Sequence, residues 1–302
     1  LFLQDILLKG SLDGLKKIIK ASENLDMVTI VGLPFLNNFK LYNVAAVVFN
    51  GALLGLVPKQ HIPNYSEFYE ARHFAVGPKE VSYIDIPELG YELEDSGSFV
   101  SFGANLLFKA KNLPELVIGI DICEDLWMPV PPSCYHAMAS ATVIANLSAS
   151  DETTGKDLYR RELVKNQSAR LISGYIYADA GEGESSTDLV FAGHNLIAEN
   201  GSILSETKRF ENGMTISEID LGRLVSERRR MSTFTINDPE TNGYEVAEFE
   251  FKNICDTTLT RHFEKTPFVP NDKNDRDRRC DEILNIQAKG LKKRLEHTHC
   301  KS

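Results

Sequence analysis

The sequence contains few cysteines, and none of them stands in the close pairs that disulfide frameworks and zinc sites use. Its five cysteines show no CxxC spacing. An odd number of scattered cysteines indicates reduced thiols, which are typical of the cytosol, and it argues against a bound metal. We therefore expect a cytoplasmic protein without a metal site. The cysteines are Cys123, Cys134, Cys255, Cys280 and Cys300.

Long hydrophobic runs and an excess of basic residues are absent as well. The apolar N-terminal stretch LFLQDILL is too short to span a bilayer and lacks the features of a targeting signal. The 33 Lys and Arg residues against 43 Asp and Glu give a formal net charge of −10, which repels phosphate backbones. We interpret the cationic run Arg228–Arg230 as the solvated end of a helix. We expect neither a membrane nor a nucleic acid as partner.

A phosphate-binding loop is also missing. The glycine-rich stretch GEGESSTD, at 181–188, lacks the GxxxxGK[ST] spacing of a P-loop and carries three acids, which disfavour phosphate. We interpret this stretch as a loop near the mouth of a pocket.

The composition that remains, 42% hydrophobic and 25% charged over 302 residues, is typical of a soluble globular protein. Asn-Gly stands twice between apolar runs, at Asn50-Gly51 and Asn200-Gly201. Because a type I′ turn needs positive φ at both central positions, each pair predicts a β-hairpin. Helices alternate with the other strands, which favours a mixed sheet system with helices outside. The expected helices are 1–20, 133–140, 157–172, 221–230 and 277–296, and the other main strands are 27–31, 116–122, 142–147 and 174–178.

Residues 232–276 have a different texture. They carry prolines and several Asn and Asp residues, and they show little periodicity except at 244–251. This composition predicts an extended arm or linker. We expect three parts, namely a main domain over 1–231, the arm over 232–276 and a final segment over 277–302.

One cysteine follows a hydrophobic strand directly. The stretch IGIDICEDLW, at 118–127, runs from the strand into Cys123, then into two acids and the only tryptophan. Cys123 is either a buried strand-end thiol, since free cysteine is among the most buried residue types, or a nucleophile at a strand-end turn. In the second interpretation the amide N–H of Glu124 points at an oxyanion.

A lysine stands in a comparable place upstream. Lys59 follows the apolar run 53–57 and comes directly after Pro58. A lone lysine after a strand is ordinarily a solvated surface residue. Here Pro58 fixes the exit of the chain from the strand, which favours a position at the same sheet rim as Cys123.

Taken together, these stretches resemble the nitrilase superfamily, and in particular the glutaminase domain of glutamine-dependent NAD synthetases. ICEDLW resembles the nucleophile motif, and PKQHIPNY, at 58–65, resembles the segment with the catalytic lysine. The resemblance implies an α/β (α+β) four-layer α-β-β-α sandwich with an extended C-terminal arm and a linker helix. It also implies that Cys123 is the nucleophile and that Lys59, with the Glu124 amide, stabilises the oxyanion.

Further motifs resemble the glutamine pocket of NAD synthetases. NLSAS, at 146–150, is followed by Gly155-Lys156. The resemblance implies that Tyr65, Ser150 and Lys156 contact the substrate, because the α-carboxylate and α-ammonium of an amino acid need charged and hydroxyl partners at fixed places. Ser150 is also a candidate N-cap of the following helix, and the two roles are compatible. Glu67 matches an auxiliary glutamate of related amidases.

Two parts of the family pattern have no match. The general-base glutamate lies on a strand before the helix that 1–20 resembles, and Glu23 comes after that helix. We therefore interpret 1–231 as a glutaminase domain without its first strand and expect impaired turnover. The SGGxDS pyrophosphate loop of the synthetase domain is also missing, so 277–302 matches only its start. ATP and Mg²⁺ are expected in that missing C-terminal domain, and no cofactor is expected in 1–302.

The implied reaction is hydrolysis of L-glutamine to glutamate and ammonia through a thioester. The ammonia serves the ATP-dependent amidation of nicotinic acid adenine dinucleotide, which makes the whole enzyme a ligase. The family also implies a homo-oligomer. Two alternatives stay open: a free-standing nitrilase-like amidase that acts on another small amide, and a non-catalytic oligomerisation scaffold.

Overall fold

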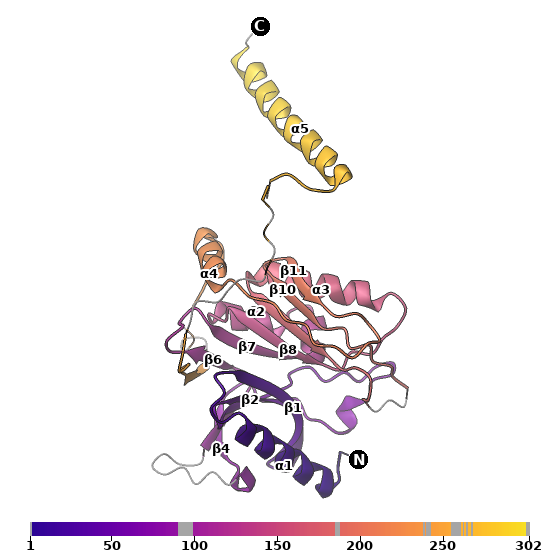
Figure 1. Cartoon of the computed structure of the whole chain (residues 1–302), viewed down its shortest axis with the longest axis vertical. Coiled ribbons are helices and arrows are strands. Elements are labelled where there is room, and N and C mark those ends of the chain that lie inside the picture. Colours follow the sequence, from indigo (N-terminus) through magenta and orange to yellow (C-terminus); the bar gives the residue numbers. More distant parts are fainter. Residues whose placement is uncertain are drawn as a thin grey trace. The chain divides into compact units, whose positions relative to one another are not determined.

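The computed structural model describes residues 2–89, 99–184, 188–237, 239, 243–254, 261, 263, 265–266 and 268–299. Cys255, Cys300 and parts of the stretch at 181–188 and of the predicted arm lie outside them. The strands fall into two groups, β1 (Val28–Asn37), β2 (Lys40–Phe49), β3 (Ala52–Pro58), β4 (Ser82–Asp85) and β5 (Phe99–Phe102), and then β6 (Leu106–Ala110), β7 (Val117–Ile122), β8 (Val143–Ser148), β9 (Gly174–Asp179), β10 (Leu196–Glu199), β11 (Ser202–Glu206) and β12 (Glu245–Phe249). Within the described residues they form a sheet in the order β1-β2-β3-β5-β4 and another in the order β11-β10-β9-β8-β7-β6-β12 (Figure 1).

Helices cover the outer faces of the two sheets. α1 (Asp5–Ala21) covers the first sheet, and α2 (Pro132–Met138) and α3 (Lys156–Leu171) cover the second. The other helices of the described residues are α4 (Leu221–Arg230) and α5 (Lys273–Thr298), with 3₁₀ turns η1 (Glu70–Arg72), η2 (Pro87–Leu89) and η3 (Cys123–Trp127). Leu15 and Ile19 of α1 pack on the first sheet, and apolar side chains of α2 and α3 pack on the second. The layers follow the order helix, sheet, sheet, helix (Figure 1), which is the predicted α-β-β-α sandwich.

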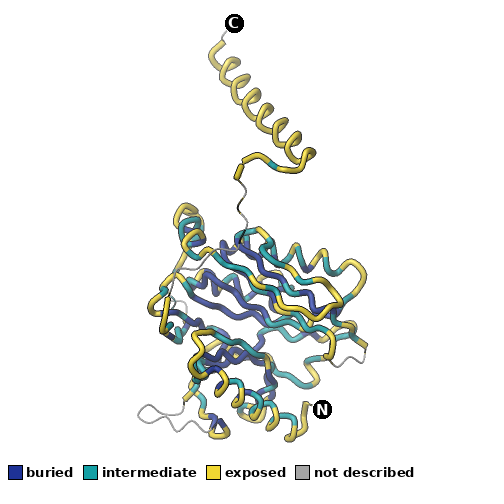
Figure 2. Tube along the Cα trace, in the orientation of Figure 1, coloured by how far each residue is buried: buried dark blue, intermediate teal, exposed yellow. Residues whose placement is uncertain are grey.

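Strand β2 shows how the layers stack. Ala45 and Val47 face the second sheet, whereas Val44, Ala46 and Val48 belong to the cluster under α1. All five side chains are fully buried, and Figure 2 shows buried strands in both sheets. Because successive side chains of a strand point to opposite faces, a strand covered on both sides is apolar throughout its length.

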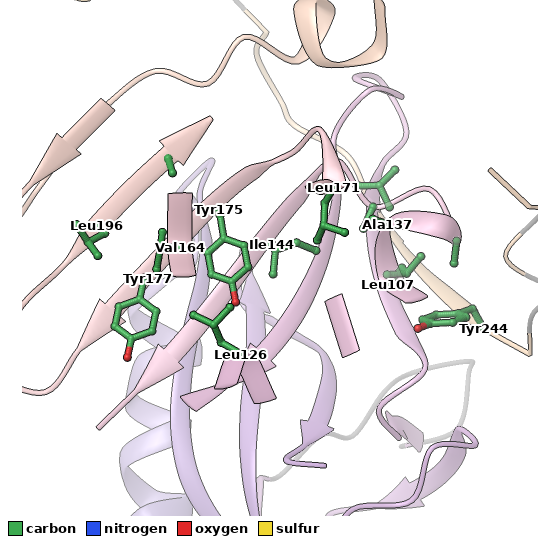
Figure 3. Close-up of a cluster of buried hydrophobic side chains, with 14 residues drawn as sticks. Leu107, Leu126, Ala137, Ile144, Val164, Leu171, Tyr175, Tyr177, Leu196 and Tyr244 are labelled. Carbon is green, nitrogen blue, oxygen red and sulfur yellow. The ribbon is translucent and has the colours of Figure 1, made fainter. Parts of the chain in front are cut away.

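A second apolar layer lies between the seven-stranded sheet and its helices (Figure 3). Ile144 and Tyr175 of the sheet face Val164 and Leu171 of α3 in this cluster. These side chains fix α3 on β8 and β9 and thereby fix the position of the loop that joins β8 to α3. That loop carries part of the candidate site.

Both predicted hairpins are confirmed. Asn50 and Gly51 have φ of 46° and 82° between the antiparallel strands β2 and β3, and Asn200 and Gly201 have φ of 43° and 84° between β10 and β11. A third hairpin, between β1 and β2, turns at Asn38-Phe39 with φ of 48° and 62°. It was not predicted, because Phe39 is not a residue that ordinarily favours positive φ.

The interpretation of Arg228–Arg230 as a solvated helix end was wrong for Arg228, whereas Arg229 and Arg230 are exposed at the end of α4. Arg228 is not a solvated helix end, because only 4% of it is exposed. Its guanidinium donates hydrogen bonds to the carbonyl oxygens of Leu171, Ile172 and Ala141. It thus satisfies carbonyl groups at the C-terminal end of α3 that have no partner within the helix.

The C-terminal third does not consist only of extended chain. Strand β12, within the predicted arm, pairs in parallel with β6 at the edge of the seven-stranded sheet. The chain divides into two compact units, Leu1–Thr258 and Leu259–Ser302, and all described residues of α5 are exposed. The proposed division at 231 and 276 stays a prediction.

None of the helices in the described part of the chain is both long enough and apolar enough to cross a membrane.

Candidate active site

Cys123 stands at the carboxyl end of β7, where the chain turns into η3. Its φ is 50°, a conformation that non-glycine residues rarely adopt and that is typical of functional sites. Asn146 of the neighbouring strand β8 accepts a hydrogen bond from the Cys123 amide at 3.1 Å, and Asp125 accepts one from Ile122 at 2.9 Å. We call this turn the elbow. Its strained backbone is held by side chains on either side of the cysteine.

The elbow lies at the carboxyl-terminal edge of three parallel strands of the second sheet. Strands β7, β8 and β9 are parallel, with Ile122 paired to Leu147 and Ser148 paired to Asp179. The residues that follow these strands therefore meet at one edge of the sheet, the usual place for a site in α/β proteins. This arrangement brings Cys123 and the loop that contains Ser150 together.

Lys59 is the residue directly after β3, in the other sheet. Only 3% of it is exposed, and its ammonium lies 2.5 Å from a carboxylate oxygen of Glu70. The other oxygen of Glu70 accepts a hydrogen bond from the side chain of Asn43 at 2.9 Å. A buried charge requires such partners, so Lys59 is not a solvated surface lysine.

A hydrogen-bonded bridge joins the segment after Lys59 to the elbow. Asp125 accepts hydrogen bonds from the His61 amide at 3.0 Å and pairs with the His61 ring at 2.7 Å. The same carboxylate also holds the Ile122 amide. The two sheets are therefore locked together where Lys59 and Cys123 emerge.

The charges of Lys59 and Cys123 act on each other. Burial raises the pKa of the Cys123 thiol, whereas the Lys59 ammonium lowers it. Hydrogen bonds from Ser148 and from the backbone at Ala149 lower it further, and Glu70 opposes them. For Lys59, burial lowers the pKa, but Cys123 and Glu70 outweigh burial and the net shift is upward. The net pKa shift of the Cys123 thiol is also upward, because burial outweighs these lowering effects. The site thus holds a cation whose charge favours the thiolate, against the burial that disfavours it.

A group of aromatic and charged side chains lies next to the elbow. The Tyr65 hydroxyl donates a hydrogen bond to Glu124 at 2.8 Å, and the Tyr65 ring packs edge-on against Phe68 at 5.7 Å. The Lys156 ammonium lies over the rings of Phe68 and Trp127, at 5.7 Å and 5.3 Å. These contacts link the predicted residues Tyr65, Glu124 and Lys156 in one chain of neighbours around Cys123.

This geometry suits a small amide. A thiol near a buried ammonium can attack a carbonyl carbon, and the neighbouring side chains offer both signs of charge to the rest of the molecule. A sequence profile of the carbon-nitrogen hydrolases matches residues 6–229. The chain belongs to the carbon-nitrogen hydrolase family.

Relatives of this carbon-nitrogen hydrolase point to one subgroup. The chain is 42% identical to the glutamine-dependent NAD(+) synthetase of Mycobacterium tuberculosis (strain ATCC 25618 / H37Rv) over 97% of its own length. It is 40% identical to that of Mycobacterium leprae (strain TN) over 98% of its length. It spans 43% of the length of either relative.

Solved structures agree with the fold. A glutamine-dependent NAD(+) synthetase from Cytophaga hutchinsonii superposes with a TM-score of 0.59 and 27% identity over 71% of this chain and 33% of that one. A carbon-nitrogen hydrolase from Helicobacter pylori G27 gives 0.56 at 18% identity over 74% of this chain and 72% of that one. The expected resemblance to NAD synthetases and the nitrilase-like fold are confirmed.

Glu70 was not among the residues that the sequence singled out. The sequence predicts Glu67 as the auxiliary glutamate of this hydrolase, but the carboxylate against the Lys59 ammonium is that of Glu70. Burial and the hydrogen bond to Glu124 raise the pKa of Tyr65, and the charge of Glu67 adds a smaller effect of the same sign. Two glutamates three positions apart cannot be told apart by pattern alone, because the loop conformation decides which one faces inward. Which of them assists catalysis remains a prediction.

Ser150 does not cap α3. The N-cap position is Gly155, with φ of 83°, and the helix begins at Lys156. The Ser150 amide donates to Asp179 at 2.9 Å, and its hydroxyl accepts a hydrogen bond from Arg160 at 3.2 Å. The N-cap role that the sequence left open for Ser150 is therefore wrong.

The described part of this hydrolase contains no cluster of metal-ligating side chains. No group of three or more His, Cys, Asp and Glu side chains there is placed to hold a metal ion.

A buried carboxyl supports the elbow from behind. Asp121 of β7 is fully buried and accepts a hydrogen bond from the Tyr175 hydroxyl at 2.9 Å. Asn146, which holds the Cys123 amide, donates to the same hydroxyl at 3.2 Å. Burial, assisted by Asp125, raises the pKa of Asp121 to about 7.

The raised pKa of Asp121 predicts a pH dependence of stability. Between its unfolded value near 4 and about 7, the native state holds a proton that the unfolded chain has released, so stability falls as pH rises. Between about pH 5 and about pH 8, the unfolding free energy of the wild type should therefore fall by roughly 2–3 kcal/mol more than that of Asp121→Asn. Urea denaturation at both pH values measures this, with the exposed Asp13→Asn as control. An equal change in unfolding free energy between the two pH values for Asp121→Asn and the wild type would contradict the raised pKa of Asp121.

Proposed function

We propose that this chain hydrolyses the side-chain amide of L-glutamine to glutamate and ammonia, with Cys123 as the nucleophile. The observation that carries the proposal is the elbow, a strained cysteine whose thiol acts electrostatically on the buried, carboxylate-held ammonium of Lys59. The similarity to glutamine-dependent NAD(+) synthetases supports the choice of substrate.

In the proposed reaction the Cys123 thiolate attacks the amide carbon and forms a tetrahedral intermediate. The Lys59 ammonium and the Glu124 amide stabilise its oxyanion, an interaction of about 3–4 kcal/mol for one donor in other enzymes. The proton that the thiol released passes to the nitrogen, the C–N bond breaks, ammonia leaves, and a thioester remains. Water hydrolyses the thioester and restores the thiol. Glu70 holds the ammonium in place through its contact with Lys59.

The pocket residues are proposed to select an amino acid. Lys156 and the Ser150 hydroxyl bind the α-carboxylate, while Tyr65 lies near the α-ammonium together with the carboxylate of Glu124. The rings under Lys156 keep its ammonium in position. A neutral amide that has no α-carboxylate and no α-ammonium would lack most of these contacts with the protein.

The ammonia is proposed to serve a synthetase domain in the same protein. The chain spans 43% of the length of its curated relatives, which leaves room for that domain. ATP and Mg²⁺ act there, in the amidation of nicotinic acid adenine dinucleotide. A cytoplasmic homo-oligomer belongs to the same proposal.

The test uses a reactive diazoketone analogue of glutamine. We expect it to label Cys123, and neither Cys134 nor Cys280, as mapped by peptide mass spectrometry. L-Glutamine should protect Cys123, whereas propionamide at the same concentration should not. Equal protection by propionamide favours the free-standing amidase, and absence of labelling favours a non-catalytic scaffold.

A further inference from the structure

Arg160 is an arginine whose side chain is completely buried. It lies one helical turn after Lys156 in α3, and its exposed fraction is 0%. Fully buried arginines are rare, because the guanidinium must find a partner for its charge and hydrogen bonds for its donors. The proposed hydrolysis assigns no role to this residue.

The guanidinium of Arg160 holds three consecutive residues of the loop after β8. One terminal nitrogen donates to the Ser150 hydroxyl at 3.2 Å and to the Asp151 carbonyl at 3.1 Å. The other donates to the Glu152 carboxylate at 3.0 Å. The planar guanidinium holds its acceptors in fixed directions, whereas the donors of an ammonium rotate freely about one bond.

The surroundings keep Arg160 charged. Burial lowers its pKa, but Asp179 and Glu152 raise it, and the net shift is upward. The second terminal nitrogen also meets the His194 ring at 3.1 Å, and Asp179 lies 3.8 Å away. This cation is therefore a fixed part of the structure.

The contact with Ser150 determines where the serine proton points. Arginine has donors only, so Ser150 accepts the bond from Arg160, and its own hydrogen must be donated in another direction. The Ser150 amide is already bound to Asp179. A hydroxyl fixed as a donor favours an anion over a cation.

We propose that Arg160 is a positioning residue that sets the carboxylate-binding site of the substrate pocket, by fixing Ser150 as a hydrogen-bond donor and the 150–152 loop in place. The inference rests on the proposed function, because it takes the α-carboxylate of an amino acid as the ligand. Arg160 touches no reacting atom. It acts through Ser150 and through the loop that carries Asp151, the partner of Lys156.

The experiment compares two alkylating agents on Arg160→Lys, a change that keeps the charge and removes the planar guanidinium. The diazoketone analogue of glutamine carries an α-carboxylate, whereas iodoacetamide does not. We expect labelling of Cys123 by the analogue to slow about 10-fold, as for a lost hydrogen bond to a charged group, with the iodoacetamide rate unchanged. Arg170→Lys, at the exposed end of the same helix, is the matched control. An equal slowing with both reagents indicates general damage to the fold and overturns the proposal.

A double-mutant cycle with Ser150→Ala isolates the pathway. If Arg160 acts through Ser150, Arg160→Lys should slow labelling much less in the Ser150→Ala background than in wild type. Independent, additive effects would contradict the proposed role. The proposed function is contradicted by a different result, namely that wild-type Cys123 reacts with the glutamine analogue no more selectively than with iodoacetamide. A wild-type preference that Arg160→Lys leaves intact overturns only the inference about Arg160.

Discussion

Cys123→Ala is expected to abolish glutamine hydrolysis, by roughly four orders of magnitude or more, as when other enzymes lose their nucleophile. We do not expect Cys134 to substitute, because it lies in α2 and contacts Gln167 rather than Lys59. In a protein that joins this chain to a synthetase domain, glutamine-dependent NAD formation should disappear. Synthesis from added ammonia should persist, because it bypasses the thioester.

The measurement is NAD formation with glutamine or with ammonium chloride as the nitrogen source. Cys134→Ala is the matched control and should retain both activities. Loss of both activities in Cys123→Ala would mean that the cysteine maintains the fold or the domain contacts. Retention of the glutamine-dependent activity would remove Cys123 from the mechanism.

The sequence predicts the parts of the site that depend on local chain geometry. Cys123 follows a strand without a gap, and Lys59 follows Pro58 at the end of another, so both emerge at strand ends. Both Asn-Gly turns form for the same reason, since two residues with positive φ fix the hairpin. These features need no information about distant segments of the chain.

Contacts between distant segments are what the sequence leaves open. The choice of Glu70 over Glu67 as partner of Lys59 depends on the turn at η1 and on Asn43 in another strand. Arg228 and Arg160 appear in the sequence as charged residues of surface helices. The structure buries both, because carbonyl groups or carboxylates from other elements accept hydrogen bonds from their guanidinium groups. Short strands such as β4 and β5 escape prediction because few residues carry their pattern.

Lys59→Met is expected to reduce glutamine hydrolysis by about 100- to 1,000-fold, because it removes both an oxyanion donor and the counter-ion of the thiolate. The Lys59 ammonium lowers the pKa of the Cys123 thiol, so its loss should move that pKa upward. The thiolate fraction near neutral pH then falls. The pH at which iodoacetamide alkylation of Cys123 reaches half its maximal rate should rise. Lys111→Met, at an exposed position, is the control.

Glu70→Gln should shift the pKa of the Cys123 thiol in the opposite direction in the same assay. The Glu70 carboxylate raises the pKa of the thiol, so its neutral replacement should shift the alkylation profile to lower pH. A merely structural disturbance would not move the two profiles in opposite directions. If Lys59→Met leaves the profile of Cys123 in place, the ammonium and the thiol do not share one electrostatic site. The amide would then have to be activated by another group, because the thiol alone is a weak nucleophile at neutral pH.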